Sequence, residues 1–413
     1  MEYYPRKIEI KLSRWLKRKE VILLKGPRQA GKTTLLLHLK EKLNGDYVTL
    51  EDEDMLGTFE KNPKEFVKRF LGRKKKFLFI DEAQYCKIAG KIVKLLFDLY
   101  GDKLKLFVTG SGSFDIKVEI GKYLVGRAIY FELMPLDFEE FLLWKAKDLH
   151  KIFIDYKKAI MNFVSGKNIE IIKPAFEQEF NSLLQEYLIF GGFPAIVKEN
   201  DEKIKKELLK NLVRTYLEKD VFFFLNVRHI EKFRNLLSYL SFNTGSLLEI
   251  SSLMNDLKID YKTAENYLSV LSNTYILTLV SPFYKNLTTE LKKSRKIYFN
   301  DSGLRNSIIN NFLPLGSRTD RGALFENFIL NELRSFDRIN YWRTTSKAEV
   351  DFILQLDKEI IPIEVKTKTK LEKGFLSFLK TYKPKRALVF TEREFGIKKI
   401  ERTKVAFVPH FFI

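Results

Sequence analysis

Residues 21–33 read VILLKGPRQAGKT, and this stretch decides the fold. The apolar run at residues 21–24 is typical of a buried strand, and it leads into a loop that contains two glycines. Helical propensity follows from residue 33 to residue 43. A strand, a glycine-containing loop and a helix in this order predict the first unit of a parallel sheet. Two later strand-like runs, at residues 76–80 and 104–108, agree with such a sheet.

The loop GPRQAGKT, residues 26–33, fits the eight-position phosphate-binding pattern, in which backbone N–H groups and a helix N-terminus surround phosphates. Gly26 and Gly31 permit that backbone path. We expect Lys32 to reach the β- and γ-phosphates of ATP, and the Thr33 hydroxyl to bind Mg²⁺, which prefers hard oxygen ligands. The predicted cofactors are therefore ATP and Mg²⁺, and the predicted nucleotide-binding residues are Gly26, Pro27, Arg28, Gln29, Ala30, Gly31, Lys32, Thr33 and Thr34.

A second motif follows the apolar strand at residues 77–80, which leads directly into Asp81 and Glu82. Carboxylates at the C-terminal end of a parallel strand lie at the edge of the sheet where ligands bind. We expect Asp81 to hold Mg²⁺ through water, and Glu82 to polarise the attacking water as a general base. The alternative is that the pair only caps a helix.

The third strand-like run ends in VTGSGS, residues 108–113. A polar side chain at this point could sense the γ-phosphate, and Thr109 is the first candidate, with Ser111 the second. The alternative is that serine and glycine simply form a turn here.

The composition is that of a globular chain, since 45% of the 413 residues are hydrophobic and 31% are charged. This length favours two or three domains. No window offers the roughly 18 uncharged apolar residues of a membrane span, and no apolar signal-peptide stretch follows the start, so we expect a cytoplasmic protein without a membrane partner. The single cysteine, Cys86, excludes an intramolecular disulfide, and the four histidines show no zinc-ligand spacing.

The formal net charge of +20 indicates a polyanionic partner, most commonly nucleic acid. The alternative is a well-solvated surface of the kind found in thermophilic proteins, which carry many lysines and glutamates. That explanation accounts for the number of charges but not for their sign.

Seven segments together resemble AAA-type ATPases of archaea and bacteria that carry a C-terminal domain of unknown function. They are GPRQAGKT, FLFIDEAQ, FVTGSGSF, YLVGR, FELMPLDFEEF, YLIFGGFP and KIYFNDSGLRN, and they are spread over most of the chain. The resemblance implies that Arg127 acts as an arginine finger or sensor toward a γ-phosphate, the alternative being an ordinary surface arginine. It also implies that residues 191–194 shape a lid near the nucleotide, and that copies of the chain assemble through AAA-type contacts.

Helical periodicity dominates residues 138–224, and residues 247–271 have the pattern of a helix-turn-helix. With the β-rich stretch that follows, they predict a winged helix. Its recognition helix would expose Tyr261, Lys262, Thr263 and Asn266 to phosphates and base edges. Winged helices also serve in protein packing, and Glu265 on the same helix weakens the case for DNA.

Two strand-like segments near the C-terminus, EVDFIL at residues 349–354 and IPIEVK at residues 361–366, carry Asp351, Glu364 and Lys366. Because alternate residues of a strand share a face, Glu364 and Lys366 project together and Asp351 can meet them. Two carboxylates and a lysine can hold Mg²⁺ and stabilise the charge that develops during phosphodiester cleavage. An upstream helix could add Glu326 as a ligand.

This set resembles the PD-(D/E)xK nuclease fold, although Val350 stands where proline is usual, and members of that superfamily sometimes keep the fold and lose cleavage. The resemblance therefore implies the fold rather than the activity. Arg343, Lys368 and Lys370 lie close in sequence and would let a polyanion approach. The alternative is an amphipathic hairpin with charged outer residues.

The sequence thus predicts an α/β protein with a P-loop parallel-sheet ATPase core (residues 1–145), a helical lid (146–230), a winged helix (231–285) and a C-terminal α/β nuclease-like domain (286–413). Its predicted function is hydrolysis of Mg-ATP coupled to binding of nucleic acid, with DNA favoured and metal-dependent DNA cleavage as a further activity. The candidate catalytic residues are Lys32, Asp81, Glu82, Thr109, Arg127, Asp351, Glu364 and Lys366, and the candidate metal ligands are Thr33, Asp81, Glu326, Asp351 and Glu364. Two alternatives are a regulatory ATPase whose C-terminal half binds partners without cutting, and a chaperone-like remodeller of proteins.

Overall fold

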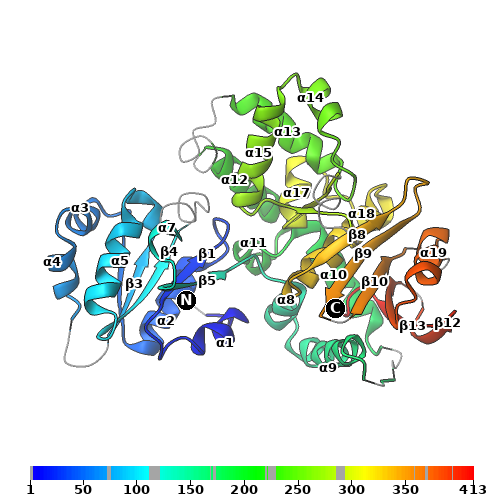
Figure 1. The fold of residues 1–413 in the computed structure, drawn as a ribbon, viewed down its shortest axis with the longest axis horizontal. Helices are drawn as coiled ribbons and strands as arrows, with labels where there is room; N and C mark the ends of the chain where they lie inside the picture. The colour runs from blue at the N-terminus through cyan, green and yellow to red at the C-terminus, as the bar shows by residue number, and fades with distance from the viewer. Residues whose placement is uncertain are drawn as a thin grey trace.

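The computed structural model describes residues 3–71, 76–110, 121–167, 169–170, 174–218, 221, 229–284, 294–357, 359–367, 371–392 and 394–413. Its N-terminal part, at the left of Figure 1, is built on a five-stranded sheet in which every neighbouring pair is parallel. The strand order is β2 (Asp46–Thr49), β3 (Lys76–Asp81), β4 (Leu104–Thr109), β1 (Val21–Lys25) and β5 (Ala128–Glu132). The predicted α/β class with a parallel-sheet core is confirmed.

Helices cover both faces of this sheet because its central strands are apolar on both sides. In β1, Ile22 and Leu24 share one hydrophobic cluster with α1 (Ile8–Ser13) and α2 (Lys32–Leu43). Val21 and Leu23 share another with α3 (Glu53–Lys61), α4 (Pro63–Lys68) and α5 (Ala89–Tyr100). Two short turns of helix, η1 (Ala83–Tyr85) and α7 (Gly121–Tyr123), lie between the strands in sequence.

The C-terminal part contains a mixed six-stranded sheet at the right of Figure 1. Its order is β12 (Gly396–Ile400), β13 (Thr403–Pro409), β11 (Arg386–Thr391), β10 (Glu359–Val365), β9 (Glu349–Leu356) and β8 (Ile339–Arg343). The pairs formed by β10 with β11 and by β11 with β13 are parallel, and the other pairs are antiparallel. Helix α19 (Lys373–Tyr382) packs on one face of this sheet and α18 (Arg321–Glu332) on the other.

Helices dominate the stretch between the two sheets. They are α8 (Phe138–Lys145), α9 (Lys147–Val164), α10 (Glu177–Phe190), α11 (Pro194–Lys198), α12 (Glu202–Thr215), α13 (Ile230–Phe242), α14 (Ile250–Leu257), α15 (Tyr261–Asn273) and α17 (Ser302–Ile308). A two-stranded antiparallel sheet of β6 (Leu277–Val280) and β7 (Lys296–Phe299) follows α15. Short turns η4 (Leu315–Ser317) and η5 (Leu333–Ser335) flank α18. Among the described ranges, none of these helices has the length and apolar character that crossing a bilayer requires.

The hydrophobic clusters show which of these elements share a core. One cluster joins α8, α9 and α10 to α18 and to one face of the six-stranded sheet. In it the ring centroids of Phe138 on α8 and Phe328 on α18 are 5.7 Å apart. A second cluster joins α12 to α15 with β6, β7 and α17. The predicted boundaries after residues 145, 230 and 285 stay predictions, and the first of these clusters contains helices from three of the predicted domains.

A buried contact joins two loops that are far apart in sequence. The Asp301 carboxylate lies at the start of α17, where its Oδ1 accepts a hydrogen bond of 2.8 Å from the N–H of Leu304. Its Oδ2 accepts one of 2.7 Å from the N–H of Gly192. A side chain at Gly303 would overlap the carbonyl of Phe190, so the two loops approach as closely as glycine allows. This contact fixes the turn that precedes α11.

Candidate functional site

The loop between β1 and α2 follows a path that its glycines make available. Gly31 precedes α2 in the left-handed region, with φ of 96°. Gly26 has φ of 150°, and a Cβ there would overlap the carbonyl oxygen of Leu133. Both positions therefore need glycine, as the sequence predicts. The N-terminus of α2 opens on the space that this loop surrounds.

Lys32, the first residue of α2, lies within the loop. Its buried ammonium group donates to the carbonyl of Gly26 at 2.9 Å and to that of Pro27 at 2.7 Å. These contacts hold a positive charge at the mouth of the loop, where the predicted role in phosphate binding requires it.

Asp81, at the end of β3, collects hydroxyl groups from three other elements. The Thr33 hydroxyl donates to Asp81 Oδ2 at 2.6 Å, and the Tyr47 hydroxyl donates to the same oxygen at 3.0 Å. Thr109, at the end of β4, donates to Asp81 Oδ1. Parallel strands end at the same edge of a sheet, so β2, β3 and β4 bring these groups together. Hydroxyl and carboxylate oxygens are the ligand set that Mg²⁺ prefers, so the residues present fit that ion.

Tyr47 was missed in the sequence, since one tyrosine in a four-residue strand carries no motif. Burial and the adjacent Asp81 carboxylate raise the pKa of its phenol, which therefore stays protonated and donates to Asp81. The pairing of β2 with β3 could have suggested the contact between Tyr47 and Asp81. Thr49 lies opposite Asp81, and Tyr47, two residues earlier on the same strand, shares the face of Thr49.

Glu82 takes a left-handed backbone conformation, with φ of 55°, which is uncommon outside glycine and is enriched at functional sites. Gln84 donates to its Oε2. The Glu82 side chain makes no capping hydrogen bond to the short helix η1 that follows, so the alternative of a helix cap lacks its defining contact. Ser111, the second candidate for a sensor, lies outside the described residues.

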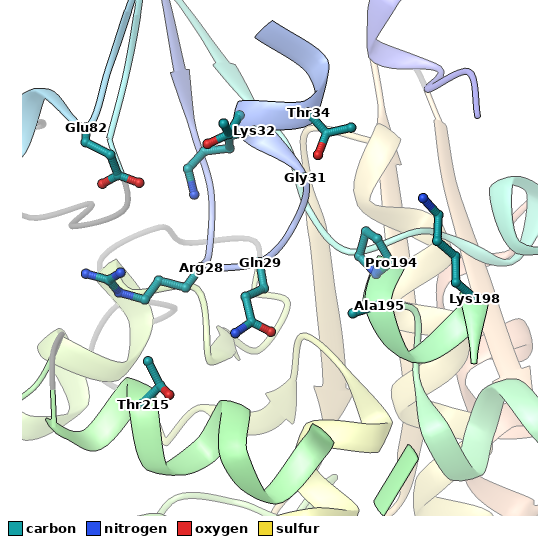
Figure 2. A pocket seen from close by; sticks show the side chains of 11 residues that line it. Arg28, Gln29, Gly31, Lys32, Thr34, Glu82, Pro194, Ala195, Lys198 and Thr215 are labelled. Atoms are coloured by element: carbon teal, nitrogen blue, oxygen red, sulfur yellow. The ribbon is translucent and has the colours of Figure 1, made fainter. Parts of the chain in front are cut away.

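A cavity of about 530 Å³ lies against the loop. Figure 2 shows Lys32 between two sides of this space, with Arg28 and Glu82 toward one side and Thr34 toward the other. The remaining wall comes from α11 and the end of α12, through Pro194, Ala195, Lys198 and Thr215. The volume lies within the range of small-molecule sites, and the lining is rich in cations and hydroxyls that suit phosphates.

Arg6 supports the loop from behind, and nothing in the sequence pointed to it. Its Nη1 donates to the carbonyl of Ala30 at 2.9 Å and its Nη2 to the carbonyl of Met134 at 2.8 Å. The same Nη2 lies 3.0 Å from Glu140 Oε2 on α8, and both side chains of this ion pair are 6% exposed. Arg6 thereby connects the phosphate loop to α8, a helix of the hydrophobic cluster that also contains α18 and one face of the six-stranded sheet.

Arg127 does not lie at the cavity of its own chain. In the parallel pair of β1 and β5, Val21 lies opposite Ala128 and Lys25 opposite Glu132. The loop follows Lys25, whereas Arg127 precedes Ala128, so the length of the strands separates them at about 3.3 Å per residue. Arg127 Nε instead lies 2.8 Å from Asp98 Oδ1. Arg127 therefore lies at the strand end away from the phosphate loop of its own chain, and its predicted role as an arginine finger or sensor stays a prediction.

The second predicted site lies on β9, β10 and α18. Lys366 Nζ is 2.9 Å from Glu364 Oε1 and 2.7 Å from Glu372 Oε1. The Asp351 carboxylate accepts a hydrogen bond of 2.7 Å from the N–H of Val365. The structure therefore brings Asp351, Glu364 and Lys366 to one place across two neighbouring strands.

A bulge in β9 helps to aim Asp351. Asn340 pairs with Ile353 and Trp342 pairs with Val350, so two steps along β8 correspond to three along β9. The extra residue falls in the stretch that contains Asp351. Bulges of this kind re-aim a side chain and are frequent next to active sites. Simple alternation along β9 could not have predicted where this carboxylate points.

The carboxylates of this site are crowded. Burial raises the pKa of Asp351 well above its ordinary value, with contributions from the Glu364 and Glu326 carboxylates. Burial likewise raises the pKa of Glu364 to about 7, against the opposing effect of Lys366. Within the described part of the chain, no three histidine, cysteine, aspartate or glutamate side chains form a ready-made metal site. Among the residues that the structure describes, the buried Glu364 Oε2 nevertheless has no hydrogen-bond partner. Mg²⁺ often needs only one or two protein carboxylates, so Asp351 and Glu364 fit such an ion.

Glu326 is engaged differently from the prediction. Its Oε1 accepts a hydrogen bond of 2.9 Å from Lys296 Nζ and another from the Tyr298 hydroxyl. Arg343 Nη1 pairs with Glu349 Oε2 at 2.9 Å, which leaves this predicted phosphate-attracting group already in an ion pair. Lys368 and Lys370 lie outside the described residues.

The predicted recognition helix is α15. Tyr261, Lys262 and Asn266 are exposed on it. The Thr263 hydroxyl donates to Asp260 Oδ2 at 2.6 Å, so it serves the start of the helix. Glu265 Oε1 lies 3.7 Å from Arg295 Nη2, and this cation partly compensates the negative charge of Glu265.

Comparison with known proteins identifies the N-terminal part of the chain. Residues 18–142 match the AAA domain family. Residues 181–314 match a domain of unknown function (DUF8612), and residues 321–411 match another (DUF4143). Similarity to a solved structure, the ORC2 protein of Aeropyrum pernix in its ADP form, covers 75% of this chain and 95% of that one at 11% identity. Its TM-score is 0.34, which is too low to support a conclusion.

Two proteins of Methanocaldococcus jannaschii are similar over most of their length. The uncharacterized protein MJ1544 is 31% identical over 373 residues, which cover 87% of this chain and 76% of that protein. The uncharacterized protein MJ1637 is 25% identical over 399 residues, covering 90% of this chain and 80% of that protein. The chain therefore belongs to the family of MJ1544, and within it residues 18–142 form an AAA domain of the P-loop type.

Proposed function

We propose that this protein hydrolyses ATP at the cavity beside the phosphate loop. The observation that carries the proposal is the convergence of Thr33, Tyr47 and Thr109 on Asp81 at the edge of this cavity. These four residues come from four different elements. Folding alone does not require them to meet beside the phosphate loop, whose backbone N–H groups can bind phosphates.

Each residue has a distinct part in the proposed reaction. The loop amides and Lys32 bind the phosphates, and Thr33 and Asp81 would hold Mg²⁺. When bound, Mg²⁺ supplies positive charge that offsets the charge of the β- and γ-phosphates. Glu82 accepts a proton from the water that attacks the γ-phosphorus, while the bond from that phosphorus to the β–γ bridging oxygen breaks and ADP leaves. Thr109 fixes the orientation of Asp81.

Two substitutions separate binding from hydrolysis. Glu82→Gln should bind ATP with near wild-type affinity and lower turnover by about 10²–10⁴, the typical effect of losing a general base. Lys32→Ala should lose affinity as well. Fluorescent nucleotide titration and phosphate release measure the two quantities, and Glu53→Gln, an exposed residue of α3, is the matched control. Unchanged turnover in Glu82→Gln would remove that residue from the mechanism.

We further propose that the partner is nucleic acid, with DNA favoured. The net charge of +20 and the exposed Tyr261, Lys262 and Asn266 of α15 support this proposal. Binding should show little sequence preference and should weaken steeply with salt, by a slope of about −0.9 in log affinity for each phosphate neutralised. Lys262→Ala should reduce that slope by about 1, whereas Lys64→Ala on α4 should not. Absence of binding at low salt would favour the protein-remodelling alternative.

We also propose that Asp351, Glu364 and Lys366 form a metal-dependent phosphodiesterase site in the C-terminal part. Two observations support this: the three residues meet across β9 and β10, and the buried Oε2 of Glu364 has no hydrogen-bond partner among the described residues. The test is incubation of the wild type, Asp351→Ala and Lys366→Ala with single-stranded, duplex and branched DNA and with Mg²⁺ or Mn²⁺. Lys32→Ala separates cleavage from use of ATP. If the wild type cuts nothing, or the site variants cut equally well, this part binds without cutting, as in the regulatory alternative.

Assembly of several copies is a final part of the proposal. Arg127 lies at the sheet edge opposite to the loop, so only a second copy could bring it to a γ-phosphate. Arg127→Ala should then lower turnover without weakening ATP binding, and turnover per chain should rise with protein concentration. Light scattering that shows only monomers at all active concentrations would contradict this part.

A further inference from the structure

A buried lysine from outside the six-stranded sheet enters the second site. Lys296 is the first residue of β7, which pairs with β6 in a separate two-stranded sheet. Its side chain is only 3% exposed. Its Nζ lies 2.9 Å from Glu326 Oε1 and also pairs with Glu349 Oε1. Tyr298, two residues along the same strand, donates to the same oxygen of Glu326.

Lys296 supplies positive charge to a site that is crowded with carboxylates. Asp351 interacts electrostatically with Lys296 and Lys366, and with the carboxylates of Glu326 and Glu364. Lys366 is already shared between Glu364 and Glu372. Burying an ammonium group is costly unless anions surround it, so Lys296 is retained by the same negative field that would attract a divalent cation.

We propose that Lys296 competes with a divalent cation for the carboxylates of this site. Before the cation binds, Lys296 keeps Glu326 from acting as a ligand. This inference rests on the proposed metal site of Asp351 and Glu364. Glu326 is then a ligand only after its contact with Lys296 is broken, which agrees with its present engagement by both Lys296 and Tyr298. Binding of the cation would loosen β7 from α18.

The first test measures Mn²⁺ affinity without any assay of activity. Lys296→Met should bind Mn²⁺ at least about tenfold more tightly than the wild type, because one neighbouring charge changes a carboxylate's affinity for a proton by about one to three powers of ten. Lys296→Arg keeps the charge and should bind no more tightly than the wild type. Lys380→Met, an exposed lysine on α19, is the matched control. Isothermal titration and electron paramagnetic resonance report the affinity.

A second measurement uses the wild type alone, in case Lys296→Met does not fold. Hydrogen exchange of the β7 amides, which pair with β6, should become faster when Mn²⁺ is added. Exchange in β10 should not become faster. Unchanged or slower exchange in β7 at saturating Mn²⁺ would overturn the inference.

The outcomes separate this inference from the proposed metal site. If the wild type binds Mn²⁺ and Asp351→Ala does not, the proposed metal site stands. If, in that case, Lys296→Met binds Mn²⁺ no more tightly than the wild type, only the competition by Lys296 is overturned. If neither the wild type nor Lys296→Met binds Mn²⁺, or if Asp351→Ala binds it equally well, both the site and the competition are overturned.

Discussion

The Asp301 carboxylate accepts a hydrogen bond from the backbone N–H of Gly192, across 109 positions of sequence. The turn that contains Gly192 leads into α11, whose Pro194, Ala195 and Lys198 line the nucleotide cavity. The cavity wall opposite the phosphate loop thus depends on a buried acid whose own position is set by α17. Burial raises the pKa of Asp301 to about 6, against the opposing hydrogen bonds from backbone N–H groups.

The first prediction concerns the pH dependence of stability. In the unfolded chain Asp301 titrates near its ordinary pKa of 3.8, so the folded state binds the proton more tightly. The stabilisation from this proton is full below about pH 4 and is lost as the pH rises to about 6, a change on the order of 2–3 kcal/mol. In Asp301→Asn this contribution should disappear. Urea unfolding at pH 4.5 and pH 7 measures it, and an equal pH effect in both proteins would contradict the assignment.

Gly192→Ala should destabilise the protein and weaken ATP binding. A Cβ at this position would overlap the carbonyl oxygen of Leu136, so the turn that holds the Gly192–Asp301 hydrogen bond must shift. The matched control is Gly57→Ala in α3, where a Cβ meets no atom of the described residues within 4 Å. There alanine should stabilise the helix by about 0.5–1 kcal/mol. Thermal unfolding distinguishes the two, and changes of the same sign would refute the steric argument.

Arg6→Met should reduce the free energy of unfolding by about 3–5 kcal/mol, because it leaves Glu140 as a buried carboxylate without its partner. It should also weaken ATP binding, since the Ala30 carbonyl in the phosphate loop loses its donor. Arg6→Met combined with Glu140→Gln should recover part of the stability but not the affinity. Chemical denaturation and nucleotide titration give both values, with exposed Arg14→Met as the control. Full recovery of affinity in the double variant would place the effect in stability alone.

Lys198→Ala should lower ATP affinity by about 10- to 100-fold, the effect of losing one hydrogen bond to a charged group. Lys198 lines the cavity, and its charge faces a ligand that carries several negative charges. Adenosine, which has no phosphate, should bind the variant and the wild type equally. Lys203→Ala, an exposed lysine on α12, serves as the control. Equal losses for ATP and adenosine would assign Lys198 to shaping the cavity instead.

The nucleotide site could be predicted from sequence where its residues follow strands. Lys32, Thr33 and Asp81 lie at motif positions, and the parallel sheet that brings Thr33, Asp81 and Thr109 together follows from the alternation of apolar runs with helices. Arg6 could not be found in this way, because its partners Ala30 and Glu140 are brought to it only by tertiary packing. The same holds for Lys198 and Thr215, which reach the cavity through the placement of α11 and α12.

The second site shows a different limit. Alternation along β10 predicted that Glu364 and Lys366 meet, and they do, at 2.9 Å. The bulge in β9 cannot be seen from alternation, because it depends on how Asn340 and Trp342 pair with the neighbouring strand. Lys296 was also invisible, since a lysine at the start of a strand is usually exposed, and only the packing of β7 against α18 buries it.

The shared hydrophobic cluster of α8, α9, α10, α18 and the six-stranded sheet limits how such a protein can evolve by recombination. The match to the AAA domain ends at residue 142, inside α8, and Phe138 of that helix packs on Phe328. A recombination breakpoint between α8 and α18 would split one core into two exposed apolar halves. Exchange of the C-terminal sheet for an unrelated module would therefore be selected against unless α8 to α10 were exchanged with it. Substitutions in the two parts should accumulate in concert.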